Sequence, residues 1–405
     1  MIMRTESDQQ RGDSGPDRSA QDDAQVIPSD LVRSADRPAP DTEERVEETD
    51  GDVDPLLMRD DPDSTARMTA GDFDPADTVD PNEQPEEPEL ARCALTLSLA
   101  TGRIDVSLIA GHGEVISAQR IPTDALVAAD AEWIFEKVTD SIDDVLHAVG
   151  IEPGESTALP GIGVVVAGRL DAAVGMVSPN GLPAWDSFPL RDRLSDRYQL
   201  EVKLLSTATA VCAGEHWRGA ARGRRNVLGM VLGHRIDGAV VIDGRFVTGT
   251  TGNAGHIGHV CVDPYGPKCG CGGRGCLEAI AGGAAIADWN RTHGGTDPAA
   301  PARGVADAAR RGDAVALATF RRAGEAIGQA VAAVVTLLDL DVVVIGGPLA
   351  DAGPVLFDPI ADGYHRFAAL SYAAPARVVP ALLGREGGQI GAAAAVLEPA
   401  VYPVG

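Results

Sequence analysis

Aromatic residues and lysine are scarce at the start of this 405-residue chain: residues 1–90 contain one aromatic residue, Phe73, and no lysine. The same segment holds ten prolines and 27 acidic residues against eight arginines, a net charge of −19. A segment with so few apolar side chains cannot bury enough surface to offset the entropy that it would lose on ordering. We therefore expect an acidic, proline-rich, disordered extension over residues 1–90, followed by an ordered part.

Long apolar runs are also absent, which excludes a membrane-spanning helix: the best candidate, residues 330–345, is interrupted by Asp339 and Asp341. The first ten residues, MIMRTESDQQ, lack the apolar segment of a signal peptide. These absences predict a cytoplasmic protein whose six cysteines are thiols or metal ligands rather than disulfides. The net charge of −26 argues against broad contact with a phosphate backbone, so DNA binding through the extension is not expected.

Apolar patterning begins directly after the extension, and one order of elements recurs. The first set comprises strands at 93–100, 105–109, 114–120, 162–167 and 201–205, with helices at 130–148 and 190–198. The second set comprises strands at 226–232, 239–242, 245–247 and 342–345, with helices at 279–293, 304–311, 314–338 and 388–397. Asp243-Gly244 marks a tight hairpin in the second set. A meander followed by alternating helices and strands, seen twice, predicts two α/β lobes around a cleft.

One imidazole and three thiols occur at a spacing typical of a metal site: His259, Cys269, Cys271 and Cys276. Four glycines lie among these cysteines and allow the backbone to fold tightly, so that all three sulfurs can face one point. An imidazole with three thiolates forms the closed tetrahedral shell of a structural zinc site. Cys261 is a rival ligand, because on a strand it would point to the same side as His259.

The segment around these ligands, GHIGHVCVDPYGPKCGCGGRGCLE, resembles the signature of the ROK family (repressors, open reading frames and sugar kinases). The segments GIGVVVAGRLD, SPNGLPAW, CAGEHWRGAARG, VVVIGGPLADAG and IGAAAAVLE also resemble the family. The resemblance implies a duplicated actin-like ATPase (ribonuclease H-like) fold, in which sugar and nucleotide meet in the cleft, and a homo-oligomer (dimer or tetramer). We accordingly expect a first lobe over 91–205, completed by the helix at 387–398, and a second lobe over 206–386 with a zinc loop at 256–278.

The resemblance also implies that the catalytic positions have changed. ROK kinases carry Asp-x-Gly-Gly-Thr after the first strand, where this chain has Ser98-Leu99-Ala100-Thr101-Gly102. The family's catalytic Asn-Asp pair aligns with Ser206-Thr207. A threonine hydroxyl cannot take a proton from a sugar hydroxyl as a carboxylate does, and losing a general base costs about 10²–10⁴ in rate.

The family's second phosphate loop, Gly-Thr-Gly-x-Gly-Gly-Gly, aligns with GHRIDGA at residues 233–239. Glycines let backbone N–H groups approach phosphate oxygens closely. We expect the side chains of Arg235, Ile236 and Asp237 to obstruct that approach, and Asp237 to repel the anion. These changes argue against ATP and magnesium as cofactors. If a nucleotide does bind, Gly346 and Gly347 are the residues expected to contact it.

The sugar-contacting positions are partly retained. In the family, a Glu-x-Gly-His motif and the glutamate after the last cysteine hydrogen-bond sugar hydroxyls. Here the motif begins with His256 and ends with His259, while Glu278 is kept. Glu278 could instead be a carboxylate favoured by a helix N-terminus, and His256 could equally be a surface imidazole. Asn180, in SPNGLPAW, is a further sugar-binding candidate.

These features predict a sugar-kinase-like ROK protein that is not catalytic and acts as a sugar-sensing or regulatory protein. One alternative is an active ATP-dependent glucose or N-acetylhexosamine kinase with a divergent site. Another is a scaffold whose acidic extension binds a basic protein partner. ROK repressors carry their DNA-binding domain at the N-terminal end of the chain, yet the extension shows no helix–turn–helix pattern.

Overall fold

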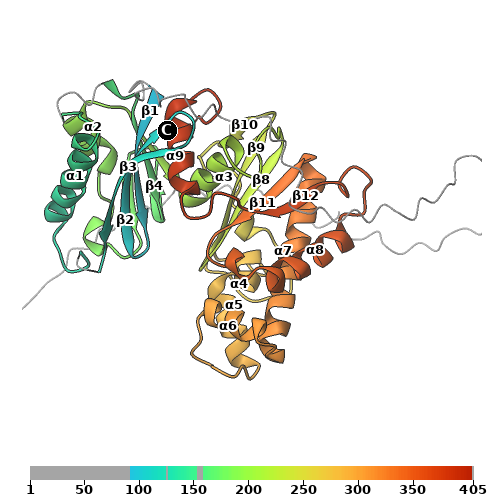
Figure 1. Ribbon diagram of the computed structural model, residues 1–405. Helices are drawn as coiled ribbons and strands as arrows, with labels where there is room; N and C mark the ends of the chain where they lie inside the picture. The colour runs from blue at the N-terminus through green and yellow to red at the C-terminus, as the bar shows by residue number, and fades with distance from the viewer. Residues whose placement is uncertain (1–91, 125, 153–157, 404–405) are drawn as a thin grey trace, which may run out of the picture. The chain divides into compact units, whose positions relative to one another are not determined.

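The computed structural model describes residues 92–124, 126–152 and 158–403, all of which belong to one compact unit (Figure 1). The predicted extension at residues 1–90 lies outside the described residues, as do its proposed disorder and its proposed partner. Across the described part of the chain, no helix is both long enough and apolar enough to cross a membrane.

The first five-stranded sheet has the strand order β3-β2-β1-β4-β7. Its strands are β1 (Cys93–Ala100), β2 (Arg103–Ala110), β3 (Val115–Pro122), β4 (Ile162–Val166) and β7 (Val202–Ser206). β1, β2 and β3 form an antiparallel meander, and β4 and β7 continue the sheet in parallel with β1. The alternation of apolar residues correctly predicted this meander, although β2 begins two residues earlier than expected.

The second five-stranded sheet repeats this plan with the order β10-β9-β8-β11-β12. Its strands are β8 (Val227–Leu232), β9 (Ile236–Ile242), β10 (Arg245–Val247), β11 (Val342–Gly346) and β12 (Arg377–Pro380). Again three strands form an antiparallel meander and two follow in parallel. Asp243 and Gly244 both have positive φ (53° and 76°), which fits the tight hairpin predicted between β9 and β10. The predicted duplication is therefore confirmed at the level of sheet topology.

Two helices pack against one face of the first sheet. α1 (Ala131–His147) begins at Asp130, whose carboxylate accepts a hydrogen bond from the backbone N–H of Trp133. Because its buried residues recur every three or four positions, α1 presents one apolar face to the core. α2 (Leu190–Tyr198) ends in the same core, where two acceptors lie within reach of the Tyr198 hydroxyl: a carboxylate oxygen of Asp143 at 2.8 Å and the Thr139 carbonyl oxygen at 3.2 Å. A short hairpin of β5 (Gly168–Asp171) and β6 (Met176–Pro179) precedes α2.

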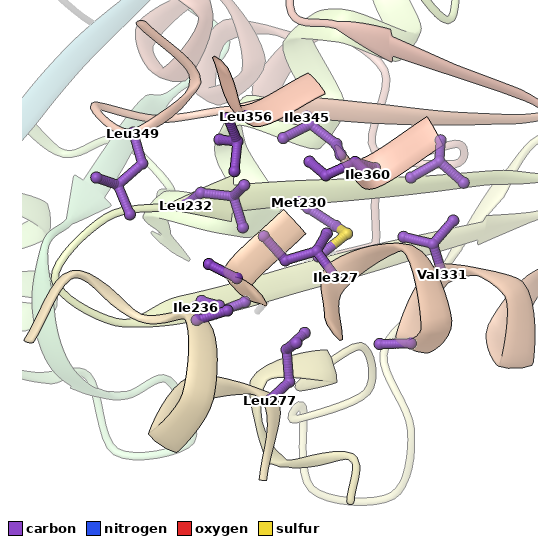
Figure 2. Close-up of a cluster of buried hydrophobic side chains, with 14 of the residues drawn as sticks. Met230, Leu232, Ile236, Leu277, Ile327, Val331, Ile345, Leu349, Leu356 and Ile360 are labelled. Carbon is purple, nitrogen blue, oxygen red and sulfur yellow. The ribbon is translucent and has the colours of Figure 1, made fainter. Parts of the chain in front are cut away.

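A larger group of helices covers the second sheet. They are α4 (Leu277–Ala281), α5 (Gly283–Thr292), α6 (Ala302–Arg310), α7 (Ala314–Leu338) and α8 (Pro354–Phe367). Figure 2 shows their core, in which Ile327 of α7 and Ile360 of α8 pack near Met230 and Ile345 of the sheet. A Cβ atom on Gly363 of α8 would lie 2.6 Å from the Glu325 carbonyl oxygen of α7, so these helices approach each other closely.

α3 (Thr207–Trp217) and α9 (Gly387–Leu397) contact each other and both sheets (Figure 1). α9 packs on β1 and β4, and α3 packs on β8 and β9. The apolar cluster around them contains Val165 of the first sheet and Val344 of the second. The expected partition into lobes at 91–205 and 206–386, and the cleft between them, remain predictions.

Three expectations about local structure were incomplete. The helix expected over 279–293 is two helices, because the chain breaks at Gly282, which has extended backbone angles (φ −66°, ψ 157°). α8 was not foreseen, since Pro354 begins it and Pro359 lies inside it. α3, β5, β6 and β12 were also not predicted.

Candidate functional site

Four potential metal ligands converge in the loop between β10 and α4. The donor atoms of His259, Cys269, Cys271 and Cys276 all lie within 4.8 Å of one another. The Sγ atoms of Cys271 and Cys276 are 3.7 Å apart, and Cys269 Sγ is 3.6 Å from His259 Nδ1. Tetrahedral coordination with Zn–S bonds of about 2.3 Å places ligand atoms roughly 3.5–3.8 Å apart. The donor set and its dimensions therefore fit zinc bound through one imidazole nitrogen and three sulfurs.

The backbone of this loop explains how the sulfurs meet. The 3₁₀ turn Ile257–His259 supplies the imidazole. Cys261 pairs with Cys276 in an isolated antiparallel bridge, and Cys269 N–H donates to the Gly273 carbonyl. Gly275 has a φ of 66° and no room for a Cβ atom beside the Asp263 carbonyl. Glycine is therefore required at that position for the loop to close.

Cys261, the rival ligand, is exposed and does not belong to the four-residue cluster. Its antiparallel pairing with Cys276 places it beside a candidate ligand, but its sulfur is not among the donor atoms that lie within 4.8 Å of one another. The four residues predicted from their spacing are thus the four whose donor atoms lie close together.

The thiols of this cluster differ in acidity. Burial, with a further contribution from the neighbouring thiols, raises the pKa of the Cys276 thiol to about 12. The backbone N–H of Gly273, which donates to Cys271 Sγ over 3.4 Å, lowers the pKa of the Cys271 thiol. A metal ion would therefore displace a proton from Cys276 when it binds, and metal binding is coupled to proton release.

Three strand ends of the first sheet lie side by side at the positions that the resemblance matches to the family's catalytic residues. Leu99 of β1 pairs with Val166 of β4, and Val166 pairs with Ser206 of β7. Ser206 caps α3, because its Oγ accepts a hydrogen bond from the Thr209 N–H over 3.1 Å. The Thr207 hydroxyl donates to the Val166 carbonyl over 3.4 Å. Both hydroxyls are engaged in local hydrogen bonds, and neither Ser206 nor Thr207 brings a carboxylate to this edge.

The loop from β8 to β9 corrects one expectation. Ile236 was expected to obstruct a phosphate, but its side chain is 3 % exposed and lies in the core near Leu277 (Figure 2). His234 and Arg235 are exposed. Of the three side chains expected to obstruct a phosphate, two therefore remain beside this loop: Arg235, which is exposed, and Asp237, which is partly buried.

Asp237 forms a polar group with two of the proposed sugar ligands. Its Oδ1 lies 3.6 Å from His256 Nδ1 and accepts the Gly238 N–H over 2.8 Å. Burial raises the pKa of the Asp237 carboxyl; the adjacent His256 opposes this, and Glu278 reinforces it. Glu278 Oε2 accepts the Ile236 N–H over 3.1 Å from the first turn of α4. The His256 and His259 rings are nearly parallel, with centroids 6.4 Å apart.

The meeting of Asp237 and His256 was not foreseen, although the sequence carried a signal for it. Gly258 allows no Cβ atom next to the Ile236 carbonyl, so the 256–259 segment packs directly on the strand that follows the loop. The resemblance implies a glycine and a glutamate at these two positions in the family, so both residues depart from the expected pattern. An imidazole and a carboxylate on adjacent segments can form a hydrogen bond or an ion pair. His259, Glu278 and His256 thus lie together around Asp237.

Asn180 belongs to a different part of the structure. It is exposed directly after β6, and its backbone N–H donates to the Ala167 carbonyl over 2.8 Å. In the described part of the chain, no hydrogen bond joins its side chain to His256, His259 or Glu278. The role of Asn180 in sugar binding remains a prediction.

Gly346 ends β11, and Gly347 begins the turn that follows it. Gly347 has a φ of 92°, and a Cβ atom there would lie 2.5 Å from the Leu232 carbonyl oxygen, so only glycine fits. Leu349 N–H donates to the same carbonyl over 3.0 Å, which holds this turn against the loop at Gly233. A pocket of about 360 Å³ adjoins the turn between Pro348, Leu349 and the arginines Arg303 and Arg310 of α6.

Two sheets of one strand order, each a meander continued by two parallel strands, define a duplicated α/β protein of the actin-like ATPase class. The family model described as "ROK family" matches residues 97–398. The chain is 33 % identical over 307 residues to a glucokinase of Thermotoga maritima, covering 72 % of this chain and 93 % of that protein. The chain belongs to the ROK family.

Solved structures agree with this assignment. The ROK hexokinase of Thermus thermophilus superposes with a TM-score of 0.66 at 29 % identity, over 75 % of this chain and 97 % of that one. A ROK family transcriptional regulator, a homologue of the Escherichia coli Mlc protein, superposes with a TM-score of 0.64 at 22 % identity. That alignment covers 76 % of this chain and 78 % of the regulator, and it shows a common fold alone.

Proposed function

We propose that this ROK protein binds a sugar without phosphorylating it and acts as a sugar-responsive regulatory protein. The observation that carries the proposal is Thr207, which stands at the aligned position of the catalytic aspartate and donates its hydroxyl to the Val166 carbonyl. A threonine hydroxyl is too weak a base to take a proton from a sugar hydroxyl, whereas an aspartate carboxylate can take it. The neighbouring Ser206 is likewise committed to capping α3.

The second support is electrostatic. A phosphate loop works because its backbone N–H groups face the anion without a side chain between them. Here the Gly238 N–H donates to the Asp237 carboxylate instead. A transferring phosphoryl group would meet the charge of that carboxylate at the place where the family presents glycine. Both halves of the phosphoryl-transfer machinery are therefore altered.

The residues proposed to hold the sugar are Glu278, His259 and His256. Glu278 uses one carboxylate oxygen to hold the Ile236 N–H, which leaves the other available to accept a sugar hydroxyl. His256 replaces the family's glutamate and is held near Asp237. Asn180 would join them only if the first sheet supplied one wall of the site, as the resemblance implies.

We further propose that the four-residue cluster holds a structural zinc ion. Four protein ligands would leave no position for water or substrate, so the ion would fix the loop rather than take part in a reaction. His259 would then link the metal to the sugar site, because its Nδ1 faces the cluster while its ring stacks beside His256. Metal analysis of protein purified without chelator should find about one equivalent of zinc per chain.

The second candidate function is an active sugar kinase. The glucokinase of Thermotoga maritima is 33 % identical, and the pocket of about 360 Å³ beside Gly346 and Gly347 offers room at the turn where a nucleotide is expected. A kinase must hold ATP and turn over, whereas a sensor needs only the sugar. Nucleotide binding and turnover therefore separate the two functions.

Calorimetry and a coupled assay on the full chain test the proposal. We expect saturable binding of glucose or an N-acetylhexosamine, weakened by Glu278→Gln, which keeps an oxygen for the Ile236 N–H but removes the charge. Glu136→Gln, an exposed change on α1, is the matched control and should leave binding unchanged. Turnover on the order of 1–10³ s⁻¹ with ATP would establish the kinase instead. Failure of every sugar to bind would exclude both functions.

A further inference from the structure

The lining of a second cavity includes none of the residues proposed to bind sugar and neither Gly346 nor Gly347. This cavity measures about 400 Å³, within the range of small-molecule sites, and one face of α7 lines it. Asp263 of the cysteine-rich loop and Trp289 of α5 border one side, and Arg366 and Phe367 at the end of α8 border the other. We call this cavity the arginine pocket, because Arg321, Arg322 and Arg366 all line it.

The cations of the arginine pocket are incompletely neutralised. Arg322 is half-buried, and its Nη1 donates to the Ile280 carbonyl over 2.8 Å. Burial lowers the pKa of the Arg322 guanidinium, and the charge of Asp263 opposes that shift. Among the described residues, no carboxylate oxygen lies within 4.0 Å of the guanidinium of Arg321 or Arg322. A partly desolvated cation without an ion-pair partner gains free energy when an anion enters beside it.

The third arginine is only loosely paired. Arg366 Nη1 lies 3.7 Å from Glu325 Oε2, and both side chains remain partly exposed. Three arginines against Asp263 and Glu325 leave the pocket with a net positive charge, in a chain whose net charge is −26. Such a local excess favours an anionic ligand. Phosphate is such an anion, and guanidinium groups match its oxygens in bidentate geometry.

The rest of the lining suits a polar ring. Gln329 donates its amide to the Val262 carbonyl over 3.1 Å, which leaves its own carbonyl oxygen to accept a hydroxyl. Trp289 is half-buried and stacks on His293 with ring centroids 3.8 Å apart, so its plane is fixed. A fixed indole offers apolar surface to the C–H face of a sugar ring. Asp263 and Glu325 add oxygens that accept hydroxyl hydrogen bonds.

We propose that the arginine pocket binds a phosphorylated sugar, with the phosphate beside Arg321 and Arg322 and the hydroxyls near Gln329 and Glu325. This site is separate from His256, His259 and Glu278, and the proposal does not require that those residues bind a sugar. A protein that binds a free sugar at one site and a sugar phosphate at another would respond to the balance between the two forms.

Titration calorimetry of the full chain with glucose 6-phosphate as the probe tests this site. We expect saturable binding at millimolar concentration or below, and weaker binding of glucose and of inorganic phosphate. Arg322→Gln should weaken glucose 6-phosphate binding by about tenfold or more, because a hydrogen-bonded charge is lost. Arg321→Gln should weaken it as well, and because Arg321 is exposed this variant should fold normally.

Two controls separate this site from the others. Arg311→Gln removes an exposed arginine at the end of α6 and should change the affinity less than twofold. Glu278→Gln should also leave glucose 6-phosphate binding unchanged, even where it abolishes glucose binding. The proposal is overturned if no saturable binding occurs up to about 10 mM, or if both arginine variants bind like the unmodified chain. Equal affinity for inorganic phosphate and glucose 6-phosphate would overturn the assignment of a sugar.

Discussion

The contact between α3 and α9 allows a sharp test with two glycines of one helix. A Cβ atom on Gly391 would overlap the Ala210 carbonyl oxygen and lie 2.6 Å from the Gly214 nitrogen. Both obstacles are backbone atoms of α3, which cannot rotate away as a side chain can. On Gly388, in contrast, the nearest atom would be Val165 Cγ1 at 3.8 Å, an ordinary van der Waals distance.

These distances predict that the same substitution, glycine to alanine, changes the free energy of unfolding in opposite directions at the two positions. Alanine favours a helix over glycine by about 0.5–1 kcal/mol, which sets an upper limit for the gain from Gly388→Ala near the start of α9. Overpacking costs about 1–3 kcal/mol, and the rigid obstacle places Gly391→Ala at the upper end. After the helix gain is subtracted, we expect Gly391→Ala to lower the free energy of unfolding by about 2 kcal/mol.

Urea denaturation followed by circular dichroism measures both variants against the unmodified chain. Gly391→Ala should lower the transition midpoint, and Gly388→Ala should leave it unchanged or raise it slightly. If the slope of the transition is preserved, the midpoints convert directly into free energies. Equal midpoints for the two variants, or a lower one for Gly388→Ala, would refute the close approach of α3 and α9.

Three further outcomes are expected. Cys271→Ser should remove most of the bound zinc and lower stability severely, whereas the neighbouring Cys261→Ser should retain about one equivalent by metal analysis. Thr207→Asp should not restore kinase turnover in a coupled assay, because the Asp237 carboxylate still occupies the phosphate loop; turnover would contradict this. Tyr198→Phe should cost about 1 kcal/mol at neutral pH through lost hydrogen bonds. Burial raises the pKa of Tyr198 above 10.0, so above that pH the unfolded chain releases a proton that the folded chain keeps. The free energy of unfolding should therefore fall as the pH rises above 10.0. Chemical denaturation should show a smaller fall in the phenylalanine variant.

Elements with a clear hydrophobic period were predictable from the sequence. The side chains of β1 alternate between two buried faces, and the apolar residues of α1 recur every three or four positions. The bounds predicted for both elements therefore lie close to the observed ones. α8 was missed because Pro359 in its interior reads as a helix breaker. The break at Gly282 was missed because the helical pattern runs on through it, although a Cβ atom there would lie 2.7 Å from the Glu278 carbonyl oxygen.

The candidate metal ligands were predictable for a different reason. Three of them fall within eight residues, so local chain geometry rather than tertiary structure decides whether they meet. The arginine pocket had no such signal, since Asp263, Arg322 and Arg366 come from segments far apart in the chain. The orientation of Ile236 was misjudged because a loop alignment does not show which side chains face the core. Only the packing of β9 against α4 settles that.

The position of α9 in the fold has a consequence for how the protein is made. Its residues Ile390 and Val396 cover apolar side chains of the first sheet such as Val165, yet the ribosome adds them only after the second sheet is complete. At translation rates of about 5–20 residues per second, one face of the first sheet waits on the order of ten seconds or more for its cover. During that interval the nascent chain presents an aggregation-prone surface that a chaperone could occupy. A ribosome that stalls before Gly387 would release a chain defective in the sheet that it synthesised first.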